Sequence, residues 1–189
     1  MKTFRSRPHT HQPLYRVVRA GWPDPLDASF SRKAADNRWN TADFSALYCC
    51  CGLPVARAVT RDILKIAAVE IEDLQPAFRP RLVEVGWSGE LVDMVSAEGI
   101  TAAGFPLSYP EGASKIRTRE LATGWHSEGA EGVVCRSASL WRLGFTDWSN
   151  DCSRIGESVL FVANWRTPPV KLRHRDDSGW LKPLSGTDG

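Results

Sequence analysis

The chain has 189 residues, of which 42% are hydrophobic and 24% charged, and its formal net charge is +2. This length and composition favour one globular domain with a sizeable core, and the interspersed charges argue against a polybasic surface for nucleic acid or membrane. Eight tryptophans suit a large aromatic core and the lining of a pocket.

The N-terminal segment is basic but holds no apolar run of about 7–15 residues, so we expect no signal peptide. Nor does any run of about 18 apolar residues occur, so we expect no transmembrane helix. Both features predict a cytoplasmic protein with reduced thiols. Cys49, Cys50 and Cys51 are contiguous, whereas zinc ligands are usually about two to four residues apart. We therefore expect the cysteines to be buried packing residues, without a metal or disulfide.

The first half of the chain contains two expected strands and one expected helix. Residues 15–20 (YRVVRA) alternate as a strand, and the two prolines in GWPDPLD then turn the chain. Residues 45–51 (SALYCCC) are the second strand. A helix follows over 54–68, because proline suits a first helical turn.

The spacing of apolar residues in this helix predicts which of its faces is buried. Its apolar positions at helical spacing are Val55, Val59, Ile63 and Ile66. Asp62 lies on or beside this stripe, which is an unusual place for a carboxylate.

The second half also alternates strands with helical or turn segments. We expect a loop between Pro76 and Pro80 and then a strand over 81–87. Helical or turn segments are expected over 91–98 and 117–127, and strands over 131–140 and 157–165. After Pro168 we expect a loosely held polar tail. The sum is one α+β domain over residues 1–189, without an internal boundary.

No Ser-His-Asp or Cys-His arrangement stands out, and no GxGxxG or Walker motif is present. Polar residues within strand-like or apolar segments are the remaining candidates: Arg16, Arg38, Tyr48, Asp62 and Ser137. Each one alone is ordinary. Together, two arginines and an aromatic ring can hold a diphosphate and a flat ring, which suggests a dinucleotide site without the usual dinucleotide fold.

The order of four short motifs resembles the RES domain from about residue 15 to about 165. These are YRVVRAG, NRWN, ALYCC followed by a helix, and EGVVCRSASL. Members of this family are typically toxins of bacterial toxin–antitoxin pairs. The resemblance implies a compact mixed-sheet fold related to ADP-ribosyltransferase toxins. It also implies cleavage of the nicotinamide–ribose bond of NAD, the substrate, without a metal.

The resemblance assigns roles by motif. Arg16 and Arg38 match the two arginines expected to hold the pyrophosphate, and Tyr48 matches the tyrosine that packs against a ring. Ser137 matches the late serine that orients a ribose or nicotinamide group. The family also implies a cognate antitoxin that blocks the pocket, for which Trp39 is a candidate anchor.

One position departs from the family pattern. The family's glutamate follows the tyrosine in a pattern like A-x-A-E, but here ARAVT places Val59 at that point. A carboxylate matters because breaking the glycosidic bond develops positive charge on the ribose. Asp62 is the expected substitute and Glu70 the second choice. Alternatively, Asp62 only pairs with Arg61 or Lys65 at the helix surface.

Three functions therefore stay open from the sequence. The first is an NAD-consuming toxin acting by phosphorolysis or hydrolysis. The second is an ADP-ribosyltransferase that modifies a specific cellular protein. The third is a catalytically inactive domain that binds a nucleotide or a partner, which Val59 favours.

Overall fold

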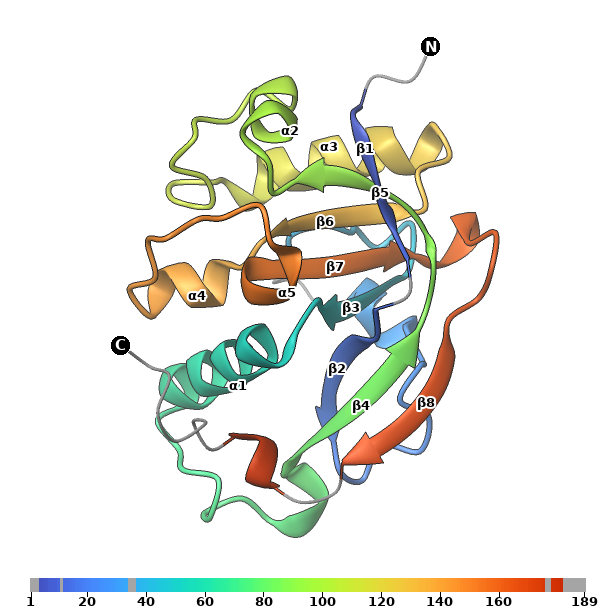
Figure 1. The fold of residues 1–189 in the computed structure, drawn as a ribbon. Helices are drawn as coiled ribbons and strands as arrows, with labels where there is room; N and C mark the ends of the chain where they lie inside the picture. Colours follow the sequence, from blue (N-terminus) through green and yellow to red (C-terminus); the bar gives the residue numbers. More distant parts are fainter. Residues whose placement is uncertain (1–3, 11, 34–36, 176–177, 182–189) are drawn as a thin grey trace.

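A mixed β-sheet forms the framework of the protein (Figure 1). In the computed structural model, which describes residues 4–10, 12–33, 37–175 and 178–181, the sheet has eight strands in the order β1-β5-β6-β7-β3-β2-β4-β8. The strands are β1 (Ser6–His9), β2 (Leu14–Arg19), β3 (Ala46–Cys50), β4 (Pro80–Gly86), β5 (Gly89–Met94), β6 (Gly132–Arg136), β7 (Gly156–Phe161) and β8 (Val170–Arg175). Neighbouring strands run antiparallel, except β5 and β6, which run parallel. The fold is therefore α+β, as the sequence predicts.

Helices gather at two places along this sheet. The described residues form α1 (Leu53–Ala67), α2 (Ala97–Ala102), α3 (Lys115–Ser127), α4 (Ala138–Arg142) and α5 (Cys152–Ile155), and the short 3-10 helices η1 (Ser29–Lys33), η2 (Pro76–Phe78), η3 (Val162–Asn164) and η4 (Ser178–Leu181). Helices α2 and α3 lie beside β5 and β6, whereas α1 packs against α4 and α5 (Figure 1). None of the described helices is long and apolar enough to cross a membrane.

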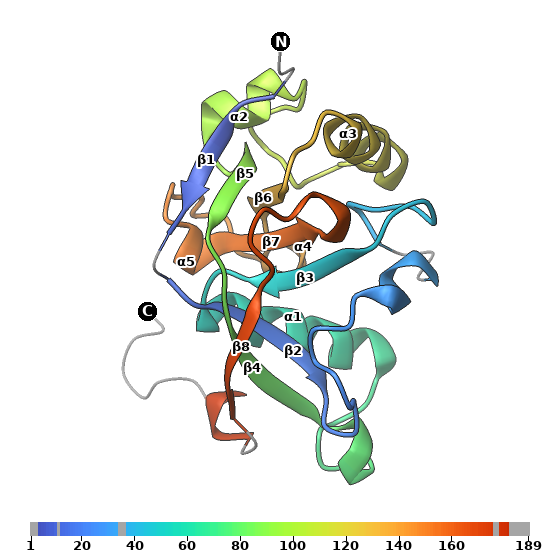
Figure 2. The same cartoon turned by 90° about the vertical axis from the view of Figure 1, so that its right-hand side faces the viewer.

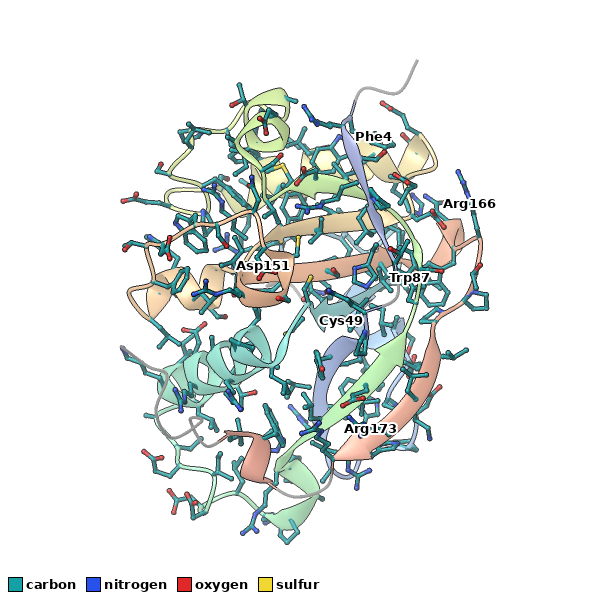
Figure 3. All side chains as sticks on the ribbon, in the orientation of Figure 1. Phe4, Cys49, Trp87, Asp151, Arg166 and Arg173 are labelled. Carbon is teal, nitrogen blue, oxygen red and sulfur yellow. The ribbon has the colours of Figure 1, made fainter. Side chains whose placement is uncertain are left out.

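The sheet is strongly twisted, as expected for L-amino acids. Figure 2 shows β3 and β7 running across the view, whereas β4 and β8 run from top to bottom. The edge strand β8 is tied to β4 by ion pairs, because Arg173 (Figure 3) and Arg175 lie 2.7 and 3.4 Å from the carboxylate oxygens of the buried Glu84. The predicted loose tail is thus wrong for residues 170–175.

Both faces of the central strands are buried, so neighbouring residues along one strand enter different clusters. Val133 of β6 packs with Trp125 and Phe161, whereas the next residue, Val134, packs with Leu160 on the other face. The three contiguous cysteines of β3 and its end are buried in the same way and are free thiols, in line with the packing role predicted for them.

Helix α1 has Pro54 in its first turn, as predicted, but it buries a different face. Its buried residues are Val55, Ala56, Ala58, Thr60 and Asp62. The predicted stripe is wrong at its end, because Ile63 is 57% and Ile66 71% exposed. Small side chains let α1 approach α4 and α5 closely, and this turns the branched residues outward.

Residues 91–98 differ most from expectation. They form the end of β5 and the start of α2 instead of a helix or turn alone. Leu91, Val92, Met94 and Val95 are all buried, and so short an apolar segment, interrupted only by Asp93, has no period that separates strand from helix. The expected strand over 131–140 also ends early, because Ser137 caps α4 by accepting a hydrogen bond from the backbone N–H of Leu140 at 3.3 Å.

The last described segment, with Trp180 3% and Leu181 8% exposed, packs under α1. The backbone carbonyls of these two residues accept hydrogen bonds from Arg57 at 2.6 Å and Arg61 at 3.3 Å. Residues 178–181 are therefore a part of the core that the polar sequence around them did not predict.

We predict that Trp180→Ala lowers the free energy of unfolding by about 3–5 kcal/mol, because it leaves a large cavity under α1. Phe78→Ala is the control, since Phe78 is 50% exposed, and it should cost less than about 1 kcal/mol. Chemical denaturation monitored by circular dichroism measures both. Equal small losses would show that the segment contributes nothing to the core.

Candidate functional site

Three arginines and one glutamate meet at a pocket of about 160 Å³ between the sheet and α4. It is lined by Asn37, Arg38, Trp39, Tyr48, Tyr109, Cys135, Arg136, Ala138, Ser139, Arg142 and Glu157. Among the described residues, no group of three or more histidine, cysteine, aspartate or glutamate side chains is arranged to hold a metal ion. The guanidinium groups in its wall suit the pocket to an anion.

Strand register brings Tyr48 and Glu157 together in this pocket. Tyr48 of β3 lies opposite Val159 of β7, and Glu157 of β7 lies opposite both Cys50 of β3 and Cys135 of β6. Paired residues of antiparallel strands project to the same face, and so do residues two apart on one strand. Tyr48 and Glu157 therefore stand diagonally beside each other on one face.

The Tyr48 hydroxyl is held by the segment that carries Arg38. It donates to Oδ1 of Asn40 at 2.9 Å and accepts from the backbone N–H of Trp39 at 3.1 Å. The buried Asn40 in turn donates to the backbone carbonyls of Ser31 at 3.0 Å and Phe44 at 3.3 Å. Burial raises the pKa of Tyr48, so the side chain stays a neutral phenol.

Arg38 is the lining residue best placed to receive a ligand. Its Nη1 is buried and has no hydrogen-bond partner among the described residues. A buried guanidinium nitrogen without a partner is costly, and a bound anion would satisfy it. The anion-binding role of Arg38 stays a prediction, and this unpaired nitrogen is the atom that it concerns.

Trp39 does not serve as an exposed anchor for a partner. Its side chain is only 2% exposed and stacks on Trp125 with ring centroids 5.8 Å apart. The predicted anchor role is therefore wrong. Trp39 forms part of the pocket wall instead.

Arg16 does not line the pocket. Tyr15 of β2 pairs with Cys50 of β3, so Arg16 projects from the opposite face of the sheet to the Tyr48 side chain. Its guanidinium donates to the backbone carbonyls of Tyr48 at 3.0 Å and Asp27 at 3.2 Å, and it is 8% exposed. Contrary to our expectation that both arginines hold one diphosphate, Arg16 supports the strand that carries Tyr48.

Asp62 is committed to an ion pair that the sequence did not predict. Both of its carboxylate oxygens accept from Nε of Arg142, at 3.1 and 2.9 Å, and Oδ2 also accepts from Nη2 at 2.5 Å. Desolvation opposes ionisation, but hydrogen bonds from Arg142 and Ser139 hold the pKa of Asp62 below its usual value. The expected surface pairs with Arg61 or Lys65 are thus wrong, and Asp62 fixes a pocket arginine.

Neither of the other positions considered on α1 supplies a carboxylate to the pocket. Val59 packs against the cluster around Val55 and Trp180, and Glu70 lies exposed beyond the end of the helix. The place where the resemblance puts the family's glutamate is therefore held by a partly buried apolar side chain that packs against the core.

Glu157 is the functional candidate that the sequence did not identify. Its Oε1 accepts a hydrogen bond from the hydroxyl of Ser137 at 2.5 Å, so Ser137 acts on the pocket through it. Desolvation raises the pKa of Glu157, although the Ser137 hydrogen bond and the charges of Arg38 and Arg142 oppose the rise. The available signal was one acidic residue at the start of an otherwise apolar strand.

The architecture and the motifs carried by β2, β3, β6 and α1 define the class of the protein. The RES domain family matches residues 13–148, and the chain belongs to this family. No curated protein matches the chain. Among solved structures, it is similar to a chain of the M. tuberculosis MbcT–MbcA toxin–antitoxin complex, with a TM-score of 0.64 and 15% identity over 85% of this chain and 84% of that one.

We predict that Asp62→Asn lowers the free energy of unfolding at neutral pH by about 1–2 kcal/mol, because Arg142 loses its ion pair but stays 37% exposed to water. A carboxyl whose pKa is lowered by folding stabilises the protein above its unfolded pKa. The difference between wild type and variant should therefore shrink as the pH falls below the ordinary aspartate value of 3.8. Chemical denaturation from pH 7 to about pH 2.5 tests this, with Glu70→Gln as the control. A difference that does not depend on pH would contradict it.

Proposed function

We propose that this protein is the toxin of a bacterial toxin–antitoxin pair and cleaves the nicotinamide–ribose bond of NAD. The pocket carries the proposal, because the charges of Arg38 and Arg142 act on its single carboxylate, Glu157, which stands beside Tyr48. The third arginine of the wall, Arg136, donates to the backbone carbonyls of Leu107 and Tyr109. Membership of the RES family and the likeness to a chain of a toxin–antitoxin complex support it. NAD enters as the substrate, and a cytoplasmic location would give the enzyme access to it.

The size of the pocket limits which part of NAD it encloses. Its volume of about 160 Å³ is below the roughly 300–1,000 Å³ of sites that bury a whole drug-sized ligand. A group the size of a nicotinamide ring fits, and the remainder of the dinucleotide would extend outward. Arg142 is already paired with Asp62, so Arg38, with its unpaired Nη1, is the main candidate for the pyrophosphate.

The acceptor of the ADP-ribosyl group distinguishes three versions of the reaction. Water would give free ADP-ribose, inorganic phosphate would give ADP-ribose phosphate, and a protein target would become labelled. Incubation of the purified chain with NAD labelled in the adenylate part, with and without phosphate and with cell lysate, separates these products. Unchanged NAD under all three conditions would instead support the inactive binding domain.

We predict that Arg38→Ala lowers kcat/KM for NAD by about 10–100-fold, which corresponds to the loss of one charged hydrogen bond of about 1.5–3 kcal/mol, and that it removes toxicity. The melting temperature should not fall, since Nη1 has no partner to lose. Arg19→Ala is the matched control, because Arg19 is exposed on β2 and lies over the ring of Phe78 at 5.5 Å. Wild-type toxicity of a folded Arg38→Ala protein would remove Arg38 from the site.

We also predict a cognate antitoxin protein that covers the pocket, because a free NAD-consuming enzyme would deplete its own host. Expression of the chain alone should stop growth and lower cellular NAD, and co-expression of the antitoxin should restore both. The Arg38→Ala chain should be tolerated without the antitoxin. Purification of active wild-type chain in high yield, from a sensitive host and without any partner, would count against this.

A further inference from the structure

We propose that Glu157 of β7 is the catalytic carboxylate of this protein and acts in place of the glutamate that other family members carry on the helix after the tyrosine. The inference rests on the proposed function, since it assigns a residue to the NAD-cleaving step. The carboxylate has moved from the helix layer into the central strand of the sheet.

The position of Glu157 is the first reason. Among the described residues that line the pocket it is the one carboxylate, and strand register sets it diagonally beside Tyr48. Ser137 donates to its Oε1 at 2.5 Å, which leaves Oε2 available to face a ligand. The same serine is the N-cap of α4, so the carboxylate is tied to a helix end and to a strand at once.

The second reason is that no other acidic residue considered for this role presents a free carboxylate to the pocket. Asp62 gives both oxygens to Arg142, so it could reach a ribose only by abandoning a chelated ion pair. Val59 has no charge, and Glu70 is exposed beyond the helix. Glu157 remains as the acidic group that the pocket presents.

The surroundings of Glu157 fit a group that must be charged in the reaction but not neutralised by a tight ion pair. Burial raises its pKa, while the Ser137 hydrogen bond and the charges of Arg38 and Arg142 favour the ionised form; Asp62 acts in the opposite direction. A carboxylate in such a desolvated site interacts more strongly with developing positive charge than one in water. We therefore expect activity to rise with pH as this group loses its proton.

The step that Glu157 assists conserves atoms and charge. The bond between C1′ of the ribose and N1 of nicotinamide breaks, its electron pair goes to N1, and nicotinamide leaves as a neutral molecule. Positive charge then develops on C1′ and the ring oxygen, and the Glu157 carboxylate stabilises it. An oxygen of water or of inorganic phosphate bonds to C1′. When water is the acceptor, it loses one proton, which Glu157 can take and pass to solvent.

The test separates chemistry from binding. Glu157→Gln keeps the size of the side chain and its hydrogen-bonding capacity toward Ser137 but removes the charge. We expect kcat to fall at least about 100-fold, while the dissociation constant for NAD, measured by calorimetry under conditions of slow turnover, changes less than about threefold. Glu157→Asp should keep intermediate activity. Glu84→Gln is the matched control, since Glu84 is a buried strand glutamate outside the pocket, and its kcat should equal that of wild type.

A second variant probes the same group without removing it. Ser137→Ala deletes the hydrogen bond that favours the ionised Glu157, so the acidic limb of the kcat profile should move to higher pH. A purely structural role of Ser137 would lower activity at all pH values alike. This profile still tests the proposal if Glu157→Gln fails to fold.

The outcomes are distinct. If wild type cleaves NAD and folded Glu157→Gln cleaves it as fast, Glu157 is not the catalytic carboxylate and the proposed function stands. If Ser137→Ala leaves the pH profile in place, the inference is overturned as well. If the wild-type chain cleaves no NAD under any acceptor condition, the proposed function fails and the assignment of Glu157 fails with it.

Discussion

The position of β7 between β6 and β3 is the constraint on which the pocket depends. Side chains of a strand alternate between faces, so a shift of one residue in either pairing would turn Glu157 away from Tyr48 and bring Ser158 in its place. The apolar residues on both faces of β7, among them Val159 and Leu160, prevent that shift, because each must enter its own cluster. Packing of the core thus sets the chemistry of the site.

Local sequence was sufficient for the elements whose pattern lies within one segment. Short motifs were enough to predict the strand before Gly21 and the helix that opens at Pro54. They were also enough to single out Arg38 and Tyr48, which line the pocket. Arg16 and Glu157 could not be placed in this way, because the face on which each projects is decided by strands distant in sequence. The order of the motifs indicated the family, but only pairing across the sheet showed which charged groups meet.

Helix α1 also has a role that its own sequence does not reveal. With Val59 packed against the core, the helix offers the pocket no carboxylate, but through Asp62 it holds Arg142 of α4 by a bidentate ion pair. The Asp62 carboxylate is buried, so removing Arg142 would leave a buried charge without its partner, which costs more than the pair itself contributes. The pair therefore fixes α4 against α1, and α4 begins at the serine that holds Glu157.

The packing of Trp180 and Leu181 beneath α1 sets an order of events during synthesis. A ribosome adds residues from the N-terminus at about 5–20 per second, so this segment is made after every strand of the sheet and after α4. Until it has emerged, α1 lacks the side chains that cover its underside and the carbonyls that Arg57 and Arg61 bind. A nascent chain that stops short of residues 178–181 thus lacks part of the packing that holds α1 in place, so the helix is covered from beneath late in translation.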